Sequence, residues 1–402
     1  MPVKGLLKVP VVYTGSVKNL RQKKKPSGSR PGVLWFEYTD AYSVFDYGKM
    51  PDEIADKGAA AAMMTACLFD EIARPATWKA FHKTGVLDKV KCKTMRRELA
   101  DSQALKNMRI SGLATHYQGV VNDEGRCVAL DKLSKPSQVL QVAGVRIIHP
   151  QTAVIRGRRL YNYTMFSPGM KNHLAPLECI FRFGLPKGSS LLERLAKNPE
   201  YAEEIGISAN AKEGSTLFRP VMEFSTKLEP ADRYISYEFA MNAAGMEAEE
   251  FTNLLHGMTL SALWLKEKFL SIGLKLWDGK FEFLRLGEGL ALGDAITPDE
   301  LRLTYKKLQV SKELLRQYHN IHQPEFAEAM DKAKKIAQRD DRSLPKIVAD
   351  LGHSPKPVDP AVISAMSDMY AGITERLMGR DIFGGRADLA DVVKKLKKLG
   401  IG

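Results

Sequence analysis

The sequence predicts an α+β protein of at least two lobes, in which strands and helices occupy different stretches of the chain. Short apolar, β-branched or aromatic runs dominate residues 7–45 and return between 113 and 184. A stretch with helical spacing follows at 246–274, and most of the C-terminal part is also helical. Strands and helices do not alternate regularly, and no Gly-x-Gly-x-x-Gly follows a strand, so a dinucleotide-binding fold is poorly supported.

The elements follow one another along the chain in this order. Residues 7–45 predict a hairpin whose two apolar strands are joined by a long polar loop. An Ala- and Met-rich helix is expected at 56–72. The charged segment 74–110, helical around 86–108, predicts an insertion that lies on the surface. Short strands separated by turn residues then lead to the long helix at 246–274.

Composition limits the classes of protein that fit. The chain has 402 residues, 44% hydrophobic and 27% charged, as expected of a soluble globular protein with two or three domains. No window approaches about 18 consecutive apolar residues, and the N-terminus lacks a secretory signal, so we expect a cytoplasmic protein with no membrane partner. Four scattered cysteines form no Cys-x-x-Cys pair, which argues against a zinc site or a disulfide framework.

The net charge of +13 is compatible with nucleic acid, with an anionic small substrate, or with a solvated basic surface. The basic residues are spread along the chain, with small concentrations at 21–30, 89–97 and 394–400. None of these resembles a helix-turn-helix, zinc-finger or RNA-recognition signature. Nucleic acid is therefore not expected as the main partner.

One strand carries an unusual row of charges. In the stretch 276–283, Leu-Trp-Asp-Gly-Lys-Phe-Glu-Phe, the residues Asp278, Lys280 and Glu282 alternate with large apolar residues. Successive side chains of a strand point to opposite faces, so the three charges are expected on one face. Such a face lies either against water or against something charged.

The turn after this strand predicts which residues pair. Gly287 and Gly289 flank Glu288 between two apolar runs, which indicates a hairpin loop of about three to five residues. If the turn centres on Glu288, Glu282 is expected opposite Asp294, and two facing carboxylates repel unless a cation such as Mg²⁺ lies between them. A register slip of one residue would move Asp294 to the other face, and a solvated face is the alternative.

A second segment predicts an anion site. Glu178 and Arg182 are evenly spaced on the strand in "PLECIFRFG", so both are expected on one face. Gly188 and Ser189 then open a helix, where backbone N–H groups and a hydroxyl can bind a phosphate. Serine at this position is also common for purely structural reasons.

Together, and in this order, these segments resemble the SAICAR synthetase (phosphoribosylaminoimidazole-succinocarboxamide synthase) family of purine biosynthesis. The stretches that carry the resemblance are "TDAYSVFD…KG" at 39–58, "SGLATHY" at 111–117, "PLECIFR…KGSS" at 176–190, "WDGKFEF" at 277–283 and "LGDAITPDELR" at 292–302. The C-terminal stretches "SKELLRQY" and "MYAGITERLMGRDIF" are similar to the last helices of longer family members. The resemblance covers most of the chain apart from the insertion.

The resemblance implies a two-lobed SAICAR synthetase-like fold with ATP and Mg²⁺ in the cleft between the lobes. Residues 1–172 would form the β-rich ATP-binding lobe, and residues 173–402 the lobe with the metal and ribonucleotide site and the terminal helices. The implied reaction joins the carboxylate of carboxyaminoimidazole ribonucleotide to L-aspartate through an acyl phosphate, giving SAICAR, ADP and phosphate. Whether the chain forms a homo-oligomer is left open.

The resemblance also implies a role for individual residues. The catalytic residues beside the reacting groups would be Lys280, Asp278 and Glu178. The metal ligands would be Glu282 and Asp294. The residues that bind the ribonucleotide and the amino acid would be Arg182, Ser189, Arg302, Asp46, Lys57, Lys227 and Asp232. The residues over the ATP phosphates would be Gly15, Ser16 and Lys18.

Two positions depart from the family pattern. Ser16 stands where the family has a lysine after the glycine, and Ala295 stands where it has a glutamate after Asp294. A ligase with a different nucleotide or amino-acid substrate is therefore one alternative, and a catalytically silent, basic nucleic-acid-binding protein is another. The retained acids and lysine on the predicted charged face argue against a silent protein, because like charges are costly to keep together.

Overall fold

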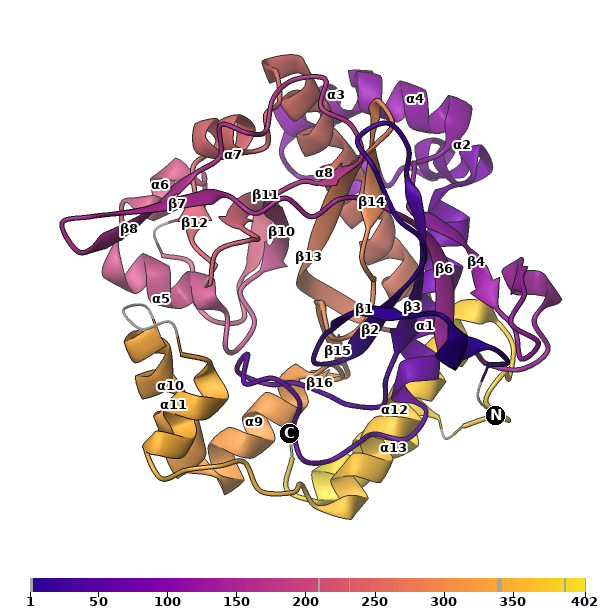
Figure 1. Ribbon diagram of the computed structural model, residues 1–402, viewed down its shortest axis with the longest axis vertical. Helices are drawn as coiled ribbons and strands as arrows, with labels where there is room; N and C mark the ends of the chain where they lie inside the picture. Colours follow the sequence, from indigo (N-terminus) through magenta and orange to yellow (C-terminus); the bar gives the residue numbers. More distant parts are fainter. Residues whose placement is uncertain (1–2, 209, 231, 338–341, 387, 402) are drawn as a thin grey trace.

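The computed structural model describes residues 3–208, 210–230, 232–337, 342–386 and 388–401 (Figure 1). It confirms a mixed α+β fold built on two antiparallel sheets. The six-stranded sheet has the order β1 (Val11–Thr14), β2 (Lys18–Lys24), β3 (Gly32–Tyr38), β6 (Val139–Gly144), β4 (Tyr117–Val121) and β5 (Cys127–Val128). Part of the stretch expected to be a polar loop is strand β2, which pairs with both β1 and β3.

The composition of strand β2 explains why the sequence predicted a loop there. Its lysines and arginine mask an alternation in which Leu20 packs against the apolar cluster around Phe36. Arg21, which faces the other way, is buried and donates to Glu37 on β3 at 2.8 Å. A cross-strand ion pair therefore stabilises a segment that its composition alone assigns to a loop.

The larger sheet has the order β12-β11-β10-β13-β15-β16, and β9 and β14 also pair with β13. Its strands are β9 (His173–Leu174), β10 (Leu177–Gly184), β11 (Thr216–Thr226), β12 (Tyr234–Ile235), β13 (Lys275–Leu286), β14 (Gly289–Gly293), β15 (Leu301–Tyr305) and β16 (Leu308–Gln309). Strand β13 lies at the centre of this sheet, so its side chains face residues from both β10 and β15.

The β13–β14 hairpin corrects the predicted register. Its closing pair is Leu286 with Gly289, so the turn holds only two residues, and Glu282 lies opposite Gly293. The expectation that Glu282 faces Asp294 is wrong by one residue. Gly287 has φ +64°, and this left-handed conformation permits the shorter turn. Asp294 is the first residue after β14 and itself has φ +58°.

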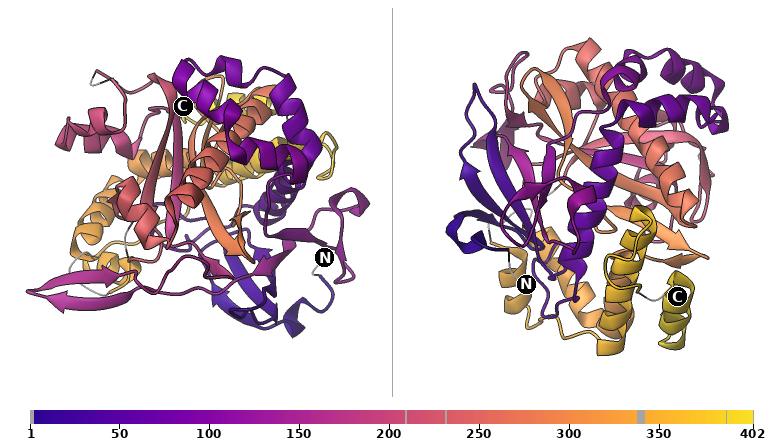
Figure 2. Two further views of the ribbon diagram at one scale, coloured as in Figure 1. Left: turned by 90° about the horizontal axis from the view of Figure 1, so that it is seen from above. Right: turned by 90° about the vertical axis from the view of Figure 1, so that its right-hand side faces the viewer.

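Two long helices cover the sheets. Helix α1 (Lys57–Ile72) packs against β3, β4 and β6 and also against α12 (Pro360–Met378). Helix α8 (Ala248–Ser271) packs against β10, β11 and β13 (Figure 2). On β10, Phe181 and Phe183 belong to the main core on the α8 side, so Glu178 and Arg182 point to the opposite side. The larger sheet thus has an apolar face and a charged face.

The insertion forms α2 (Pro75–Lys83), α3 (Lys93–Asp101) and α4 (Gln103–Ser111), with a 3₁₀ turn at Leu87–Lys89. Its inner side belongs to the main core, where Trp78 and Leu105 are buried. The insertion is therefore a packed layer over α8 with one exposed side.

The remaining elements lie around this framework. Strands β7 (Gln151–Ile155) and β8 (Arg158–Asn162) form a separate ribbon that projects from the body (Figures 1 and 2). The other helices are the 3₁₀ turns Leu6–Lys8 and Leu130–Lys132, α5 (Ser190–Lys197), α6 (Tyr201–Glu204), α7 (Tyr237–Ala243), α9 (Glu313–His322), α10 (Pro324–Ala337), α11 (Leu344–Asp350) and α13 (Leu389–Lys398). Within the described ranges, no helix is both long and apolar enough to cross a membrane.

Candidate active site

The three charges of β13 face other charged side chains. Arg182 on β10 lies directly opposite Asp278 on β13, and Arg182 Nη1 donates to Asp278 Oδ2 at 3.0 Å. Lys280 Nζ lies 3.1 Å from a carboxylate oxygen of Glu178, on the same face of β10. These partners confirm the prediction that Asp278, Lys280 and Glu282 share a face. Lys227 pairs with both Glu178 and Glu282, and so connects Glu282 to the partner of Lys280.

The arginine end of this face is closely paired. Arg302 Nη1 on β15 donates to the same Asp278 oxygen at 2.8 Å. Arg182 is buried and is also bonded to Glu223 and to the hydroxyl of Tyr234. Burial alone disfavours a charged guanidinium, but the carboxylates of Glu223 and Asp278 outweigh it and raise the pKa of Arg182.

The lysine end alternates positive and negative groups. Lys227 Nζ donates to Glu178 at 2.6 Å and to Glu282 at 2.5 Å, while Lys280 Nζ also lies 3.2 Å from Glu300. Burial opposes the charged form of Lys227, yet the two glutamates raise its pKa. Burial likewise opposes the charged form of Glu300, but the neighbouring lysines, Lys280 foremost, lower its pKa. Lys227 and Glu300 therefore remain charged near neutral pH.

Lys18, on strand β2, is a residue of the six-stranded sheet that reaches this site. Its ammonium group forms an ion pair with Asp294, and burial lowers the pKa of Lys18 to about 8 although Glu282 opposes the shift. His116 Nε2 lies 3.3 Å from the backbone oxygen of Asp294. Burial and the nearby Lys18 lower the pKa of His116 to about 3, so its ring is neutral. The β1–β2 turn that carries Gly15 closes with a bond from Gly15 N–H to the Lys18 carbonyl at 2.9 Å.

The segment expected to bind phosphate lies beside Arg302. Gly188 has φ +74°, and its carbonyl accepts a hydrogen bond from Arg302 Nη2 at 2.8 Å. Ser189 precedes helix α5, and its buried hydroxyl has no hydrogen-bond partner among the described residues. Ser190 lies 3.2 Å from the Tyr234 hydroxyl, which ties this loop to Arg182.

Three expected substrate residues lie in other surroundings. Lys57 is buried and donates to Asp299 at 2.6 Å, and Tyr370 of α12 binds the same carboxylate. Asp46 contacts Lys334 on α10. Asp232 is exposed, and charged residues of the charged face influence its pKa. It is not the ion-pair partner of Lys227, whose partners are glutamates. Their substrate roles remain predictions.

The expected metal ligands are both paired with lysines. Glu282 accepts from Lys227, and Asp294 pairs with Lys18. No group of three or more His, Cys, Asp or Glu side chains is arranged to hold a metal ion in the described part of the chain. Mg²⁺ commonly takes one or two carboxylates and completes its shell with water and substrate phosphate, so a pair of carboxylates fits this chemistry.

Sequence reasoning missed three glutamates of this site: Glu223, Glu300 and Glu313. Glu223 pairs with Arg182, Glu300 with Lys280, and Glu313 lies 3.5 Å from Arg302. Glu300 directly follows Asp299 in the Thr-Pro-Asp-Glu motif, so its place in that motif was an available signal. Glu223 joins the site only through the pairing of β11 with β10.

Solved structures share this fold. A SAICAR synthase from Saccharomyces cerevisiae complexed with SAICAR matches with a TM-score of 0.53 at 16% identity, covering 94% of this chain and 98% of the other. A SAICAR synthetase in complex with ADP gives a TM-score of 0.50 at 18% identity, covering 94% and 99%. These likenesses concern the fold alone.

The family match places this fold and its charged face in a class of carbon–nitrogen ligases. The SAICAR synthetase family model matches residues 11–333, and the chain belongs to that family of purine-biosynthesis ligases. A protein of Archaeoglobus fulgidus, named provisionally as a phosphoribosylaminoimidazole-succinocarboxamide synthase, is 31% identical over 388 residues, which is 96% of this chain and 99% of that protein. The synthase of Thermoplasma acidophilum is 28% identical over 224 residues, covering 53% of this chain and 70% of the other. The resemblance noted in the sequence is thereby confirmed.

Proposed function

We propose that this protein joins the carboxylate of carboxyaminoimidazole ribonucleotide to the amine of L-aspartate at the expense of ATP. A carboxylate is a poor electrophile, so one of its oxygens first attacks the γ-phosphorus of ATP and releases ADP. The aspartate nitrogen then attacks the acyl carbon, loses a proton, and displaces phosphate to leave the amide. Two solved proteins of this fold support the assignment by their names: one is complexed with SAICAR and the other with ADP.

The observation that carries the proposal is the alternating row of charges across β10, β11 and β13. Transfer of a phosphoryl group needs its negative charge balanced by preorganised cations. Lys280 and Lys227 are both held by Glu178, so two ammonium groups have fixed positions on one face. We assign Lys280 to the reacting phosphoryl, with Glu178 and Asp278 as the acids that orient this face.

We assign the binding of ATP to residues on or next to both sheets. Lys18 would contact the ATP phosphates under the β1–β2 turn at Gly15 and Ser16, beside Asp294. Glu282 and Asp294 would hold Mg²⁺, which would neutralise phosphate charge when bound. Lys18 and Lys227, the present partners of these acids, would then be free to contact phosphate oxygens.

The ribonucleotide phosphate falls to the loop at Gly188. Arg302 keeps part of its side chain exposed, and the Ser189 hydroxyl, which has no hydrogen-bond partner in the described part of the chain, lies buried at the start of α5. Arg182 is also expected at this phosphate, but in this conformation Glu223 and Asp278 already occupy its guanidinium. Arg182 would then act chiefly by holding Asp278, and through it Arg302, in place.

The decisive experiment is ADP release by the purified protein with Mg²⁺-ATP, carboxyaminoimidazole ribonucleotide and L-aspartate, omitting each in turn. ADP formation that requires all three, with the succinocarboxamide detected by mass spectrometry, is the expected result. ATP binding without turnover would contradict this reaction. It would favour a ligase with another nucleotide or amine, the alternative that Ser16 and Ala295 raise.

Absence of both turnover and ATP binding would remove the ligase assignment altogether. Tight, steeply salt-dependent binding of DNA or RNA in that case would indicate a silent nucleic-acid-binding protein.

A further inference from the structure

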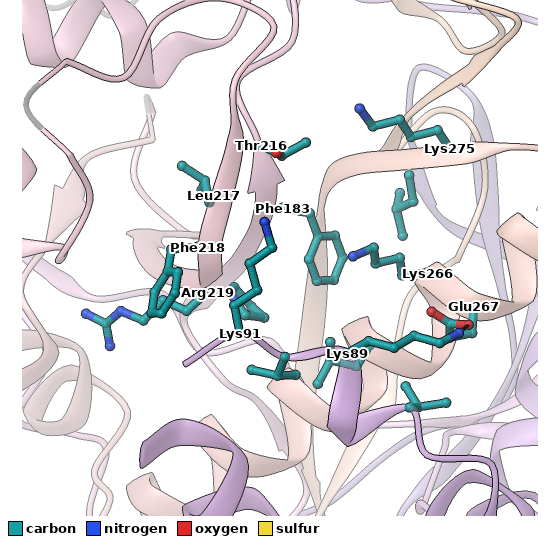
Figure 3. Close-up of a pocket in the computed structure, with 15 residues that line it drawn as sticks. Lys89, Lys91, Phe183, Thr216, Leu217, Phe218, Arg219, Lys266, Glu267 and Lys275 are labelled. Carbon is teal, nitrogen blue, oxygen red and sulfur yellow. Dashed lines mark hydrogen bonds and ion pairs between the residues drawn. The ribbon is translucent and has the colours of Figure 1, made fainter. Parts of the chain in front are cut away.

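A second group of lysines lies on the opposite side of the larger sheet, around a cavity of about 240 Å³ (Figure 3). The cavity is lined by the insertion segment 86–91, by α8, by the first residues of β13 and by the first half of β11. Helix α8 packs on the apolar side of this sheet, whereas Asp278 and Lys280 face the charged side. The cavity is therefore separate from the candidate active site.

Three of the lysines carry positive charge without a counter-ion. Within the described residues, Lys91, Lys266 and Lys275 form no ion pair with any carboxylate. Lys266 Nζ lies 4.8 Å from the ring centroid of Phe183, and Lys275 Nζ lies 3.2 Å from that of Trp277. Aromatic faces attract cations but supply no neutralising charge.

These lysines come from three separate elements, so the fold itself brings their charges together. Burial lowers the pKa of Lys266; Glu267 opposes this, and Lys89 and Lys91 add to it. Burial, and then Lys266, also lower the pKa of Lys275. Mutual repulsion of this kind is relieved when an anion binds between the ammonium groups.

The other charged residues at the cavity do not neutralise it. Glu267 is the acid that lines it, and Lys89 is already paired with Glu267. The guanidinium of Arg219 points away from the lysines (Figure 3) and donates to the carbonyl of Ile205 at 3.4 Å.

Apolar side chains form the rest of the wall. Phe183, Leu217, Pro220 and Leu263 line the cavity, together with Phe218, which is 62% exposed. A ligand that fits both surfaces needs an anionic end and an apolar skeleton. The volume lies below the roughly 300–1,000 Å³ of pockets for drug-sized ligands, so the ligand is small.

We propose that this cavity binds a small organic phosphate. Lys91, Lys266 and Lys275 would hold the phosphate, and Phe183 and Phe218 would contact the carbon skeleton. A phosphate monoester offers three acceptor oxygens and close to two negative charges at neutral pH, which suits three ammonium donors better than one carboxylate does. The site does not depend on the ligase reaction proposed above, since none of these residues belongs to it.

Isothermal titration of the full chain with phenyl phosphate tests the proposal without ATP, ribonucleotide or aspartate. We expect one binding site whose affinity falls as salt is raised. Inorganic phosphate should bind more weakly, and phenol should not bind. Equal affinity for inorganic phosphate would overturn the role of the apolar wall, and no binding at millimolar phenyl phosphate would overturn the site.

Two double variants locate the binding. Lys91→Ala/Lys266→Ala should weaken phenyl phosphate binding by about tenfold or more, because two charge-assisted contacts are lost. Lys83→Ala/Lys106→Ala makes the same change in net charge at two exposed lysines that do not line the cavity, and should leave affinity unchanged. Equal loss in both, or no loss in the first, would contradict the proposal, and the latter would place the ligand at the active-site phosphate residues.

Discussion

Arg182 and Asp278 lie directly opposite each other on neighbouring strands, and Arg182 Nη1 donates to Asp278 Oδ2 at 3.0 Å. Arg302 donates to the same oxygen from the third strand, so one carboxylate orients two guanidinium groups. The side chain of Arg182 is 3% exposed and that of Arg302 is 18% exposed. The two arginines therefore differ in what they can reach.

Substituting each arginine should separate these roles. Arg302→Ala should raise the KM for the ribonucleotide by about tenfold while lowering the free energy of unfolding by only about 1 kcal/mol. Arg182→Ala should cost about 3–5 kcal/mol of stability, because Glu223 and Asp278 lose a buried cation. Steady-state kinetics and urea denaturation measure both. If the two variants shared a raised KM and kept wild-type stability, this division of roles would be wrong.

The ionisation of Glu223 should make the free energy of unfolding depend on pH in the acid range. Burial alone raises the pKa of a carboxyl, but Arg182 and Arg194 outweigh it and lower the pKa of Glu223 to about 2 from 4.5. A lowered folded-state pKa stabilises the fold above the unfolded value, and that contribution is lost as pH falls from 4.5 towards 2.

Glu223→Gln should therefore be less stable at pH 7 and lose less stability on acidification. Urea unfolding at pH 7 and at about pH 4 measures this difference. The exposed carboxylate variant Glu203→Gln is the control and should follow the wild-type pH dependence. An identical pH dependence in Glu223→Gln and wild type would refute the assignment.

The charged face could be predicted from the sequence, but its pairing could not. Period-two alternation placed Asp278, Lys280 and Glu282 on one face, because strand geometry depends only on local sequence. The glycines after this strand predicted a turn of about three to five residues, whereas the observed turn has two, because glycines mark a turn without fixing its length and hence the register. Glu223 was missed for a different reason: it meets Arg182 through strand pairing between segments far apart in the chain.

Lys18 should determine how ATP use depends on pH. Burial lowers its pKa to about 8, so the ammonium group loses its charge within an accessible pH range. The kcat/KM for ATP should fall above about pH 8, since this ratio reports ionisations of the free enzyme. Lys18→Arg keeps its charge and should move the fall upward by about one pH unit or more.

The effect of Lys18 on stability has the opposite sign. Its folded-state pKa lies below the unfolded value of 10.5, so Lys18 makes the fold more stable as pH rises from about 8 to 10.5. A loss of activity in that range therefore cannot come from Lys18-driven unfolding. A pH profile unchanged in Lys18→Arg would exclude this lysine as the titrating group.

Glu282 and Glu288 lie on one hairpin in opposite surroundings. The Glu282 side chain is 11% exposed and pairs with Lys227, whereas Glu288 is 83% exposed at the turn and pairs with Lys171. If Glu282 is a Mg²⁺ ligand, Glu282→Gln should raise the Mg²⁺ concentration for half-maximal ADP release by about tenfold or more. Glu288→Gln removes the same charge far from the site and should leave it unchanged. Titrating free Mg²⁺ in the ADP-release assay decides this, and equal Mg²⁺ dependence in the two variants would rule Glu282 out as a ligand.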